Sequence, residues 1–307
     1  MRHFYLSKDG FRHTDDCDSA SWIDIQQPDP KDCKMLEEQL GLPPMFLEYL
    51  QDADERPRLE REQNWSMVIV RIPIINTDNT MPYTTMPIGV VITPDSKVIT
   101  ISYHPNPLIT DFIENSIRKR IVVTSQADFA LRIFYSAAYW YLKYLKDIAQ
   151  DVLGAEKDLQ RAIRNDDLIR LMRMQKSLVF FNTSIKGDVM LLERVGKMFE
   201  TTIDEDLLED VQIELRQADT TVAIYSNILE GTMDSYASII SNNVNSVMKR
   251  MTGLSIILMV PTFIASLYGM NVDILLGDNP HAFWIIIAMT VVFTAIAFIV
   301  LRRIRWV

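Results

Sequence analysis

The sequence predicts an α+β membrane protein in which a mixed α/β part is followed by long helices and then by two membrane-spanning helices. Two observations predict this class. Hydrophobic residues make up 48% of the 307-residue chain, and the charges are spread unevenly along it. The last 57 residues hold two of the 40 acids and three of the 31 bases, so the first 250 residues hold 38 acids and 28 bases. An acidic globular part is therefore joined to an apolar tail.

The first 200 residues are expected to form a cytoplasmic α/β domain that ends in a helical hairpin. Short β-rich runs predict strands at residues 22–25, 65–72, 88–93 and 97–102, and helical spacing predicts helices at 32–40 and 44–50. Beyond Gln126 the pattern is helical, and no proline occurs between residues 108 and 260. The hairpin helices are expected at about 127–153 and 166–199.

A long stalk helix is expected next, over residues 201–250. Seven positions repeat in steps of three and four, the spacing of helices that pack along their length: Leu208, Val211, Leu215, Ala218, Val222, Tyr225 and Leu229. We call these residues the stalk seam and expect it to pack against identical neighbouring subunits. Since no proline interrupts this region, the helix is expected to continue into the first membrane span, from residue 206 to 268.

Two segments near the C-terminal end are long and apolar enough to cross a bilayer. Residues 251–272 and 282–301 are uncharged runs of 22 and 20 residues, which as helices span about 33 and 30 Å. We expect transmembrane helix 1 at 251–271, an outer loop at 272–281, transmembrane helix 2 at 282–301 and a basic tail at 302–307.

The charges that flank these segments predict the orientation. Lys249 and Arg250 precede the first segment, Arg302, Arg303 and Arg305 follow the second, and the connecting loop has acids, Asp273 and Asp278, but no base. Positively charged residues stay on the cytoplasmic side. We therefore expect a multi-pass protein of the cell membrane (inner or plasma membrane) with both termini in the cytoplasm.

A second periodic face runs down the stalk into the first span. We call its lower part the polar stripe: Asn245, Met248, Met251, Ser255, Met259, Thr262 and Ser266. Asp234 lies on the same face farther up. Small hydroxyl residues on one face of a membrane helix are typical of close helix–helix packing, and a pore lining is the alternative interpretation.

The end of the first span narrows these alternatives. It reads Tyr268-Gly269-Met270-Asn271 and resembles the Gly-Met-Asn signature of the CorA family of magnesium channels. The resemblance extends over nearly the whole chain, and includes residues 22–25, 40–44, 55–58, 242–249 and 259–268.

The resemblance implies a homopentamer shaped as a funnel, with cytoplasmic α/β/α domains, stalk helices and five first spans around an axial pore. Residues 268–271 then form the selectivity filter, and the polar stripe lines the pore with Met248 and Met251 as its constriction. Mg²⁺ loses water reluctantly, so neutral oxygens of Asn271 and of the stripe suit a hydrated ion that must also be released. Asp273 and Asp278 are expected to attract cations outside.

The family also implies regulation by internal Mg²⁺. An acid of a Leu-Glu-Asp segment pairs through the ion with an aspartate on a neighbouring stalk, and here the segment reads Leu47-Glu48-Tyr49. Asp210 lies where the stalk acid is expected, and the candidate regulatory ligands are Asp210, Glu48, Asp52 and Asp234. The outer loop also departs from the family, because it lacks a Met-Pro-Glu-Leu run.

We therefore expect a channel for Mg²⁺ influx, with Co²⁺ and Ni²⁺ as further ions, gated by cytoplasmic divalent cations. A zinc transporter of the same superfamily is the alternative, and a membrane-anchored sensor or scaffold is one of a different class. An enzyme is not expected, because the chain has no phosphate-binding glycine loop and no spaced histidine cluster. We expect no organic cofactor, and the net charge of −9 argues against a nucleic-acid partner.

Overall fold

The structure, a computed structural model, describes residues 2–7, 10–17, 19–76, 80–161, 165–270, 280–304 and 306, without the side chains of 158–161. The chain divides into two compact units, Met1–Gly231 and Thr232–Val307, and each is described by itself.

A seven-stranded sheet with the order β2-β1-β3-β7-β6-β5-β4 forms the centre of the first unit. The strands are β1 (Arg2–Ser7), β2 (Phe11–Thr14), β3 (Trp22–Gln26), β4 (Arg58–Glu62), β5 (Trp65–Ile75), β6 (Tyr83–Ile92) and β7 (Val98–Ser102). β3 and β7 run parallel, and the other neighbouring pairs run antiparallel. The predictions of β3, β5, β6 and β7 are confirmed, whereas β1, β2 and β4 were not predicted.

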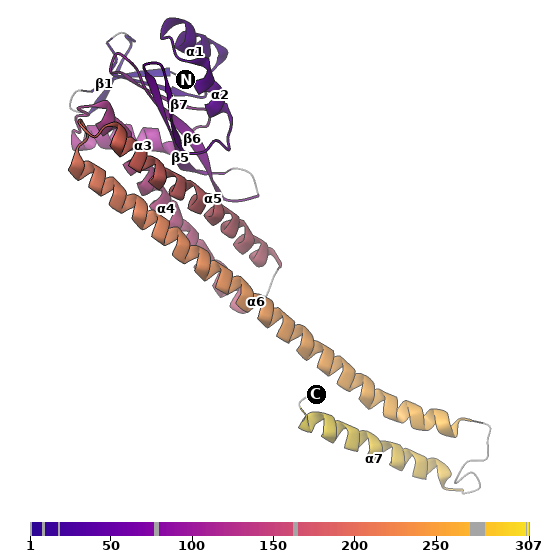
Figure 1. The fold of residues 1–307 in the computed structure, drawn as a ribbon. Coiled ribbons are helices and arrows are strands. Elements are labelled where there is room, and N and C mark those ends of the chain that lie inside the picture. The colour runs from indigo at the N-terminus through magenta and orange to yellow at the C-terminus, as the bar shows by residue number, and fades with distance from the viewer. Residues whose placement is uncertain are drawn as a thin grey trace. The chain divides into compact units, whose positions relative to one another are not determined.

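Helices cover both faces of the sheet and give three layers (Figure 1). On one face, α1 (Pro30–Lys34), the π-helix η1 (Met35–Gln39) and α2 (Pro44–Gln51) close an apolar core with the sheet. α3 (Pro107–Lys119), α4 (Gln126–Arg161) and α5 (Asn165–Met198) lie on the other face. The two long helices pack on the sheet through β5, which is buried over most of its length. The predicted hairpin is confirmed as α4 and α5.

Two helical segments differ from expectation. A single helix over 32–40 is wrong, because α1 passes into a π-helix whose last bond runs from the N–H of Leu40 to the carbonyl of Met35, at 3.2 Å. α3 was missed although its start is signalled locally. Asn106 accepts a hydrogen bond from the N–H of Ile109 at 3.2 Å, and Pro107 occupies the first turn.

α6 (Glu205–Tyr268) is a single helix of 64 residues, as predicted. In its part before Thr232, the seam residues Val211, Leu215, Ala218 and Val222 are fully buried within the single chain. Next to them, the methyl groups of Leu208 lie 3.6–3.9 Å from where a Cβ on Gly196 of α5 would be. The expectation that the seam packs on identical neighbours is therefore wrong, since helices of the same chain already cover it.

The second unit comprises the rest of α6 and α7 (Ala282–Arg303). Each contains a segment long and apolar enough to cross a membrane, with mean hydropathy of 1.7 and 2.8. In these segments only 11% and 6% of the residues are buried, so both helices leave most of their apolar side chains exposed in the single chain. A soluble protein would bury such side chains, whereas lipid or further subunits can cover them.

Candidate ion pathway

The polar stripe lies on an exposed face of α6. All seven residues are exposed in the single chain, and at about 100° per residue they cover an arc of about 120°. In the second unit, the buried residues of α6 are Tyr236, Gly253 and Ile264, and of these Gly253 and Ile264 lie on roughly the opposite side of the helix. The stripe therefore faces away from the buried side, although Met259 also borders a groove of about 730 Å³ between α6 and α7.

Two stripe hydroxyls are bonded to their own helix. Ser255 Oγ donates to the carbonyl of Met251 at 2.9 Å, and Thr262 Oγ1 donates to the carbonyl of Leu258 at 2.8 Å. A hydroxyl has one proton and two lone pairs. With the proton used inside the helix, each oxygen presents only lone pairs outward, which suits a cation or the hydrogens of its water shell.

α6 ends where the predicted filter begins. The helix stops at Tyr268, the N–H of Gly269 donates to the carbonyl of Ala265 at 3.0 Å, and Met270 is exposed. A Cβ at Gly269 would lie 3.2 Å from the carbonyl oxygen of Ala265, tighter than ordinary contact. Because glycine has no Cβ, the backbone at Gly269 can pass close to the carbonyl of Ala265 where the helix ends. Asn271, Asp273 and Asp278 lie outside the described residues.

The candidate regulatory acids are not gathered within one chain. Glu48 lies on α2, Asp52 follows it and accepts a bond from the N–H of Asp54, and Asp210 lies on α6 near Tyr135 of α4. Asp234 is an exposed residue of the second unit. Among the described residues, no group of three or more His, Cys, Asp or Glu side chains is placed to hold a metal ion. Within one chain, the described residues therefore bring these acids into no group of three protein ligands.

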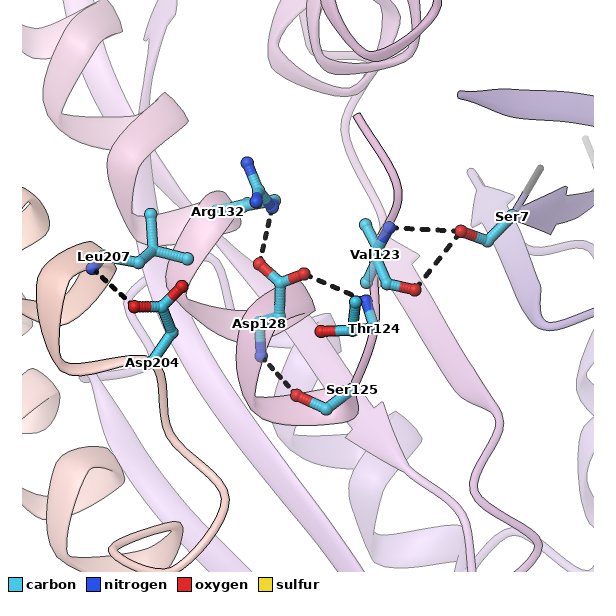
Figure 2. A network of polar contacts seen from close by, with 8 residues as sticks. All are labelled: Ser7, Val123, Thr124, Ser125, Asp128, Arg132, Asp204 and Leu207. Atoms are coloured by element: carbon cyan, nitrogen blue, oxygen red, sulfur yellow. Dashed lines mark hydrogen bonds and ion pairs between the residues drawn. The ribbon is translucent and has the colours of Figure 1, made fainter. Parts of the chain in front are cut away.

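A polar network ties the start of α4 to the sheet, as Figure 2 shows. Ser7 Oγ of β1 donates to the carbonyl of Val123 at 3.3 Å and accepts from its N–H at 3.2 Å. Asp128 accepts from the N–H of Thr124 at 3.0 Å and from Arg132 Nε at 2.6 Å. In the same view Asp204 caps α6, accepting from the N–H of Leu207 at 3.2 Å. These bonds fix where α4 and α6 begin.

A buried charged network was missed by sequence reasoning. Arg71 of β5 donates to the carbonyls of Ala53, Glu55 and Thr85, and its own N–H donates to Asp188 Oδ1 of α5 at 3.0 Å. Burial raises the pKa of Asp188 well above its usual range, although Arg71 acts in the opposite direction, and Asp188 Oδ2 has no hydrogen-bond partner. The sequence signal that could have predicted this network is Arg71 itself, because it is the one charged residue in a largely apolar 11-residue strand.

Comparisons with known proteins support a common origin for most of the chain. The family model described as "CorA-like Mg2+ transporter protein" matches residues 18–303. A curated relative, "Cobalt/magnesium transport protein CorA" of Methanocaldococcus jannaschii, is 26% identical over 293 residues, covering 93% of this chain and 91% of the relative.

Solved structures share the fold. The complete structure of the CorA magnesium transporter from M. jannaschii matches with a TM-score of 0.84 and 23% identity, covering 100% of this chain and 99% of that one. The ZntB cytoplasmic domain from Vibrio parahaemolyticus matches with a TM-score of 0.59 and 14% identity, covering 80% of this chain and 98% of that domain. At these identities the likeness establishes the fold alone.

Proposed function

Because the chain belongs to the family of CorA-like Mg²⁺ transporter proteins, which are membrane ion transporters and not enzymes, we propose that it is a channel for Mg²⁺ influx that also passes Co²⁺ and Ni²⁺. The observation that carries this proposal is the polar stripe. It is exposed, it faces away from the buried side of its unit, and in the sequence Gly269 and Asn271 follow it. A membrane anchor has no need of such a face.

The stripe and the filter act on the hydrated ion. Mg²⁺ holds its water tightly and requires octahedral geometry, so a pore that binds the water shell avoids the cost of removing it. The side-chain oxygen of Asn271 and the carbonyl of Gly269 accept hydrogen bonds from that shell. Ser255, Thr262 and Ser266 then offer neutral oxygens in succession, each weak enough to release the ion.

The pore forms between copies of the chain, and we propose a homopentamer. One α6 cannot enclose a pathway, and its stripe is exposed in the single chain. Identical helices around an axis bring five stripes face to face in a closed ring. The stalk seam contributes nothing to this argument, because it is buried inside one chain.

The proposed gate and orientation follow from the same helix. Met248 and Met251 are 61% and 63% exposed in the single chain, and a ring of these side chains would make an apolar constriction. Lys249 and Arg250, together with Arg302, Arg303 and Arg305 at and beyond the end of α7, support a cytoplasmic location of both termini under the positive-inside rule. The constriction then lies at the cytoplasmic end of the pore, and Asp273 and Asp278 lie outside.

We further propose that internal Mg²⁺ closes the gate by binding between subunits. Asp210 is an exposed acid on α6, and Glu48 and Asp52 are exposed near the end of α2. Acids that face one another across an interface repel unless a cation lies between them. Bound Mg²⁺ therefore favours the packed stalks, and a fall in internal Mg²⁺ loosens them. The Asp234 side chain is the remaining candidate ligand.

Zinc is the alternative cargo. The fold likeness to a ZntB cytoplasmic domain does not separate the two ions, because it reports architecture only. The test is uptake into proteoliposomes that hold the full chain, with Mg²⁺, Co²⁺ and Zn²⁺ supplied one at a time. We expect uptake of Mg²⁺ and Co²⁺. Uptake of Zn²⁺ alone would establish the alternative, and uptake of none of them would favour the anchored sensor.

A further inference from the structure

Two histidines of the first unit share one face at the edge of the sheet. His13 of β2 is paired with Tyr5 of β1, and His3 lies two residues before Tyr5 on the same strand. Side chains two apart along a strand lie on the same face, and diagonal neighbours are within reach of each other across a strand pair. The rings of His3 and His13 have centroids 6.0 Å apart with planes at 70°.

This spacing is close to that of two imidazoles on one metal ion. An imidazole nitrogen binds a transition metal at about 2.0–2.1 Å, which puts the ring centroid about 3.2 Å from the ion. Two rings on one tetrahedral ion then have centroids about 5.2 Å apart. The observed spacing is about 0.8 Å longer than this, and solvent reaches the His13 side chain, which is 54% exposed.

Carboxylates surround the pair on both sides. Asp15 Oδ1 lies 3.8 Å from His13 Nδ1, which is longer than a hydrogen bond. Asp24 is the cross-strand partner of His3 and is 1% exposed. His3, Asp24 and Glu114 line a cavity of about 490 Å³.

We propose that His3 and His13 bind one transition-metal ion of the Co²⁺, Ni²⁺ and Zn²⁺ class through their imidazoles, with water completing its coordination. Since no group of three protein ligands occurs among the described residues, the site is a two-histidine site of modest affinity. Imidazole prefers these ions over Mg²⁺, which prefers oxygen ligands. The site therefore distinguishes ions by ligand chemistry, which a pore that holds a hydrated ion does not do.

The test is calorimetric titration of the full chain in detergent, without a histidine tag, with Ni²⁺ as the probe. A large excess of Mg²⁺ is present to occupy sites made of oxygen ligands. The variants are His3→Asn and His13→Asn, and His104→Asn, on the segment after β7, is the matched control. Thermal unfolding without Ni²⁺ shows whether each variant is folded. If only one of His3→Asn and His13→Asn is folded, that variant alone tests the proposal.

Wild type and His104→Asn are expected to bind one Ni²⁺ per chain. His3→Asn and His13→Asn are each expected to bind it at least about tenfold more weakly. X-ray absorption at the nickel edge should show scattering from two imidazoles in wild type and from one in each of the two variants. Isotherms that superimpose for all four proteins would overturn the proposal, and the rings would then be an aromatic contact with Tyr5 only. Because binding is measured without transport, this result is independent of whether the chain conducts ions.

Discussion

At the scale of single residues, Thr262 tests the pore interpretation of the polar stripe. Its hydroxyl donates to Leu258, so only lone pairs face outward, and Thr262→Val removes them while keeping the shape. We expect Mg²⁺ uptake to fall about fivefold, which corresponds to about 1 kcal/mol for one lost hydrogen bond. Thr290→Val on α7 is the control, because its hydroxyl bonds Ile286 in the same way at 2.7 Å. Equal losses in both variants would assign the effect to helix packing.

Asp188 predicts a pH dependence of stability. Its pKa is raised in the folded chain, so folding takes up a proton, and the free energy of unfolding decreases as pH rises above the unfolded pKa of about 3.9. The loss is about 1.4 kcal/mol for each unit of pKa difference.

Asp188→Asn cannot ionise and retains the acceptor for Arg71. We expect the midpoint temperature of thermal unfolding to fall less for Asp188→Asn than for wild type as the pH rises from about 5 to about 8. Asp166→Asn, at an exposed acid of the same helix, should behave as wild type. Parallel pH profiles for all three proteins would show that Asp188 is already ionised in the folded chain.

At the scale of elements, the sequence predicted the long helices and the apolar-rich strands and missed the rest for separate reasons. β4 reads Arg-Leu-Glu-Arg-Glu, and only its pairing with β5 makes it a strand. α3 had a capping signal at Asn106 that could have been used. The stripe followed from the helical period. The seam also followed from it, but a period does not say which chain supplies the partner.

A substitution in the stalk seam can show whether the seam packs on helices of the same chain or on neighbouring subunits. Leu215 is fully buried in the single chain, so Leu215→Ala is expected to lower the free energy of unfolding by about 2–5 kcal/mol. Ile213→Ala, at a residue 55% exposed on the same helix, should cost less than about 1 kcal/mol. Light scattering should give the same oligomer mass for both. Dissociation of the Leu215→Ala protein into folded monomers would show that the stalk seam packs between subunits and not within one chain.

At the scale of the whole molecule, Asp210 tests regulation by internal Mg²⁺. If Mg²⁺ holds neighbouring stalks together through this acid, Asp210→Ala needs a higher internal concentration to inhibit the current. Currents in excised patches, measured against cytoplasmic Mg²⁺, give the inhibition curves. Glu209→Ala, the adjacent exposed acid, is the control and should follow wild type. Superimposed curves for Asp210→Ala and wild type would make Asp210 an ordinary surface acid.

We propose that five copies of α6 conduct a hydrated divalent cation along their polar stripes to a filter at residues 268–271. The most direct test is Mg²⁺ uptake into proteoliposomes by Asn271→Ala, beside Asn243→Ala on an exposed position outside the stripe. Light scattering confirms that both variants assemble as wild type does. We predict that Asn271→Ala abolishes uptake while Asn243→Ala retains it. Uptake near the wild-type rate in a normally assembled Asn271→Ala protein would show that the Asn271 side chain is not part of a selectivity filter.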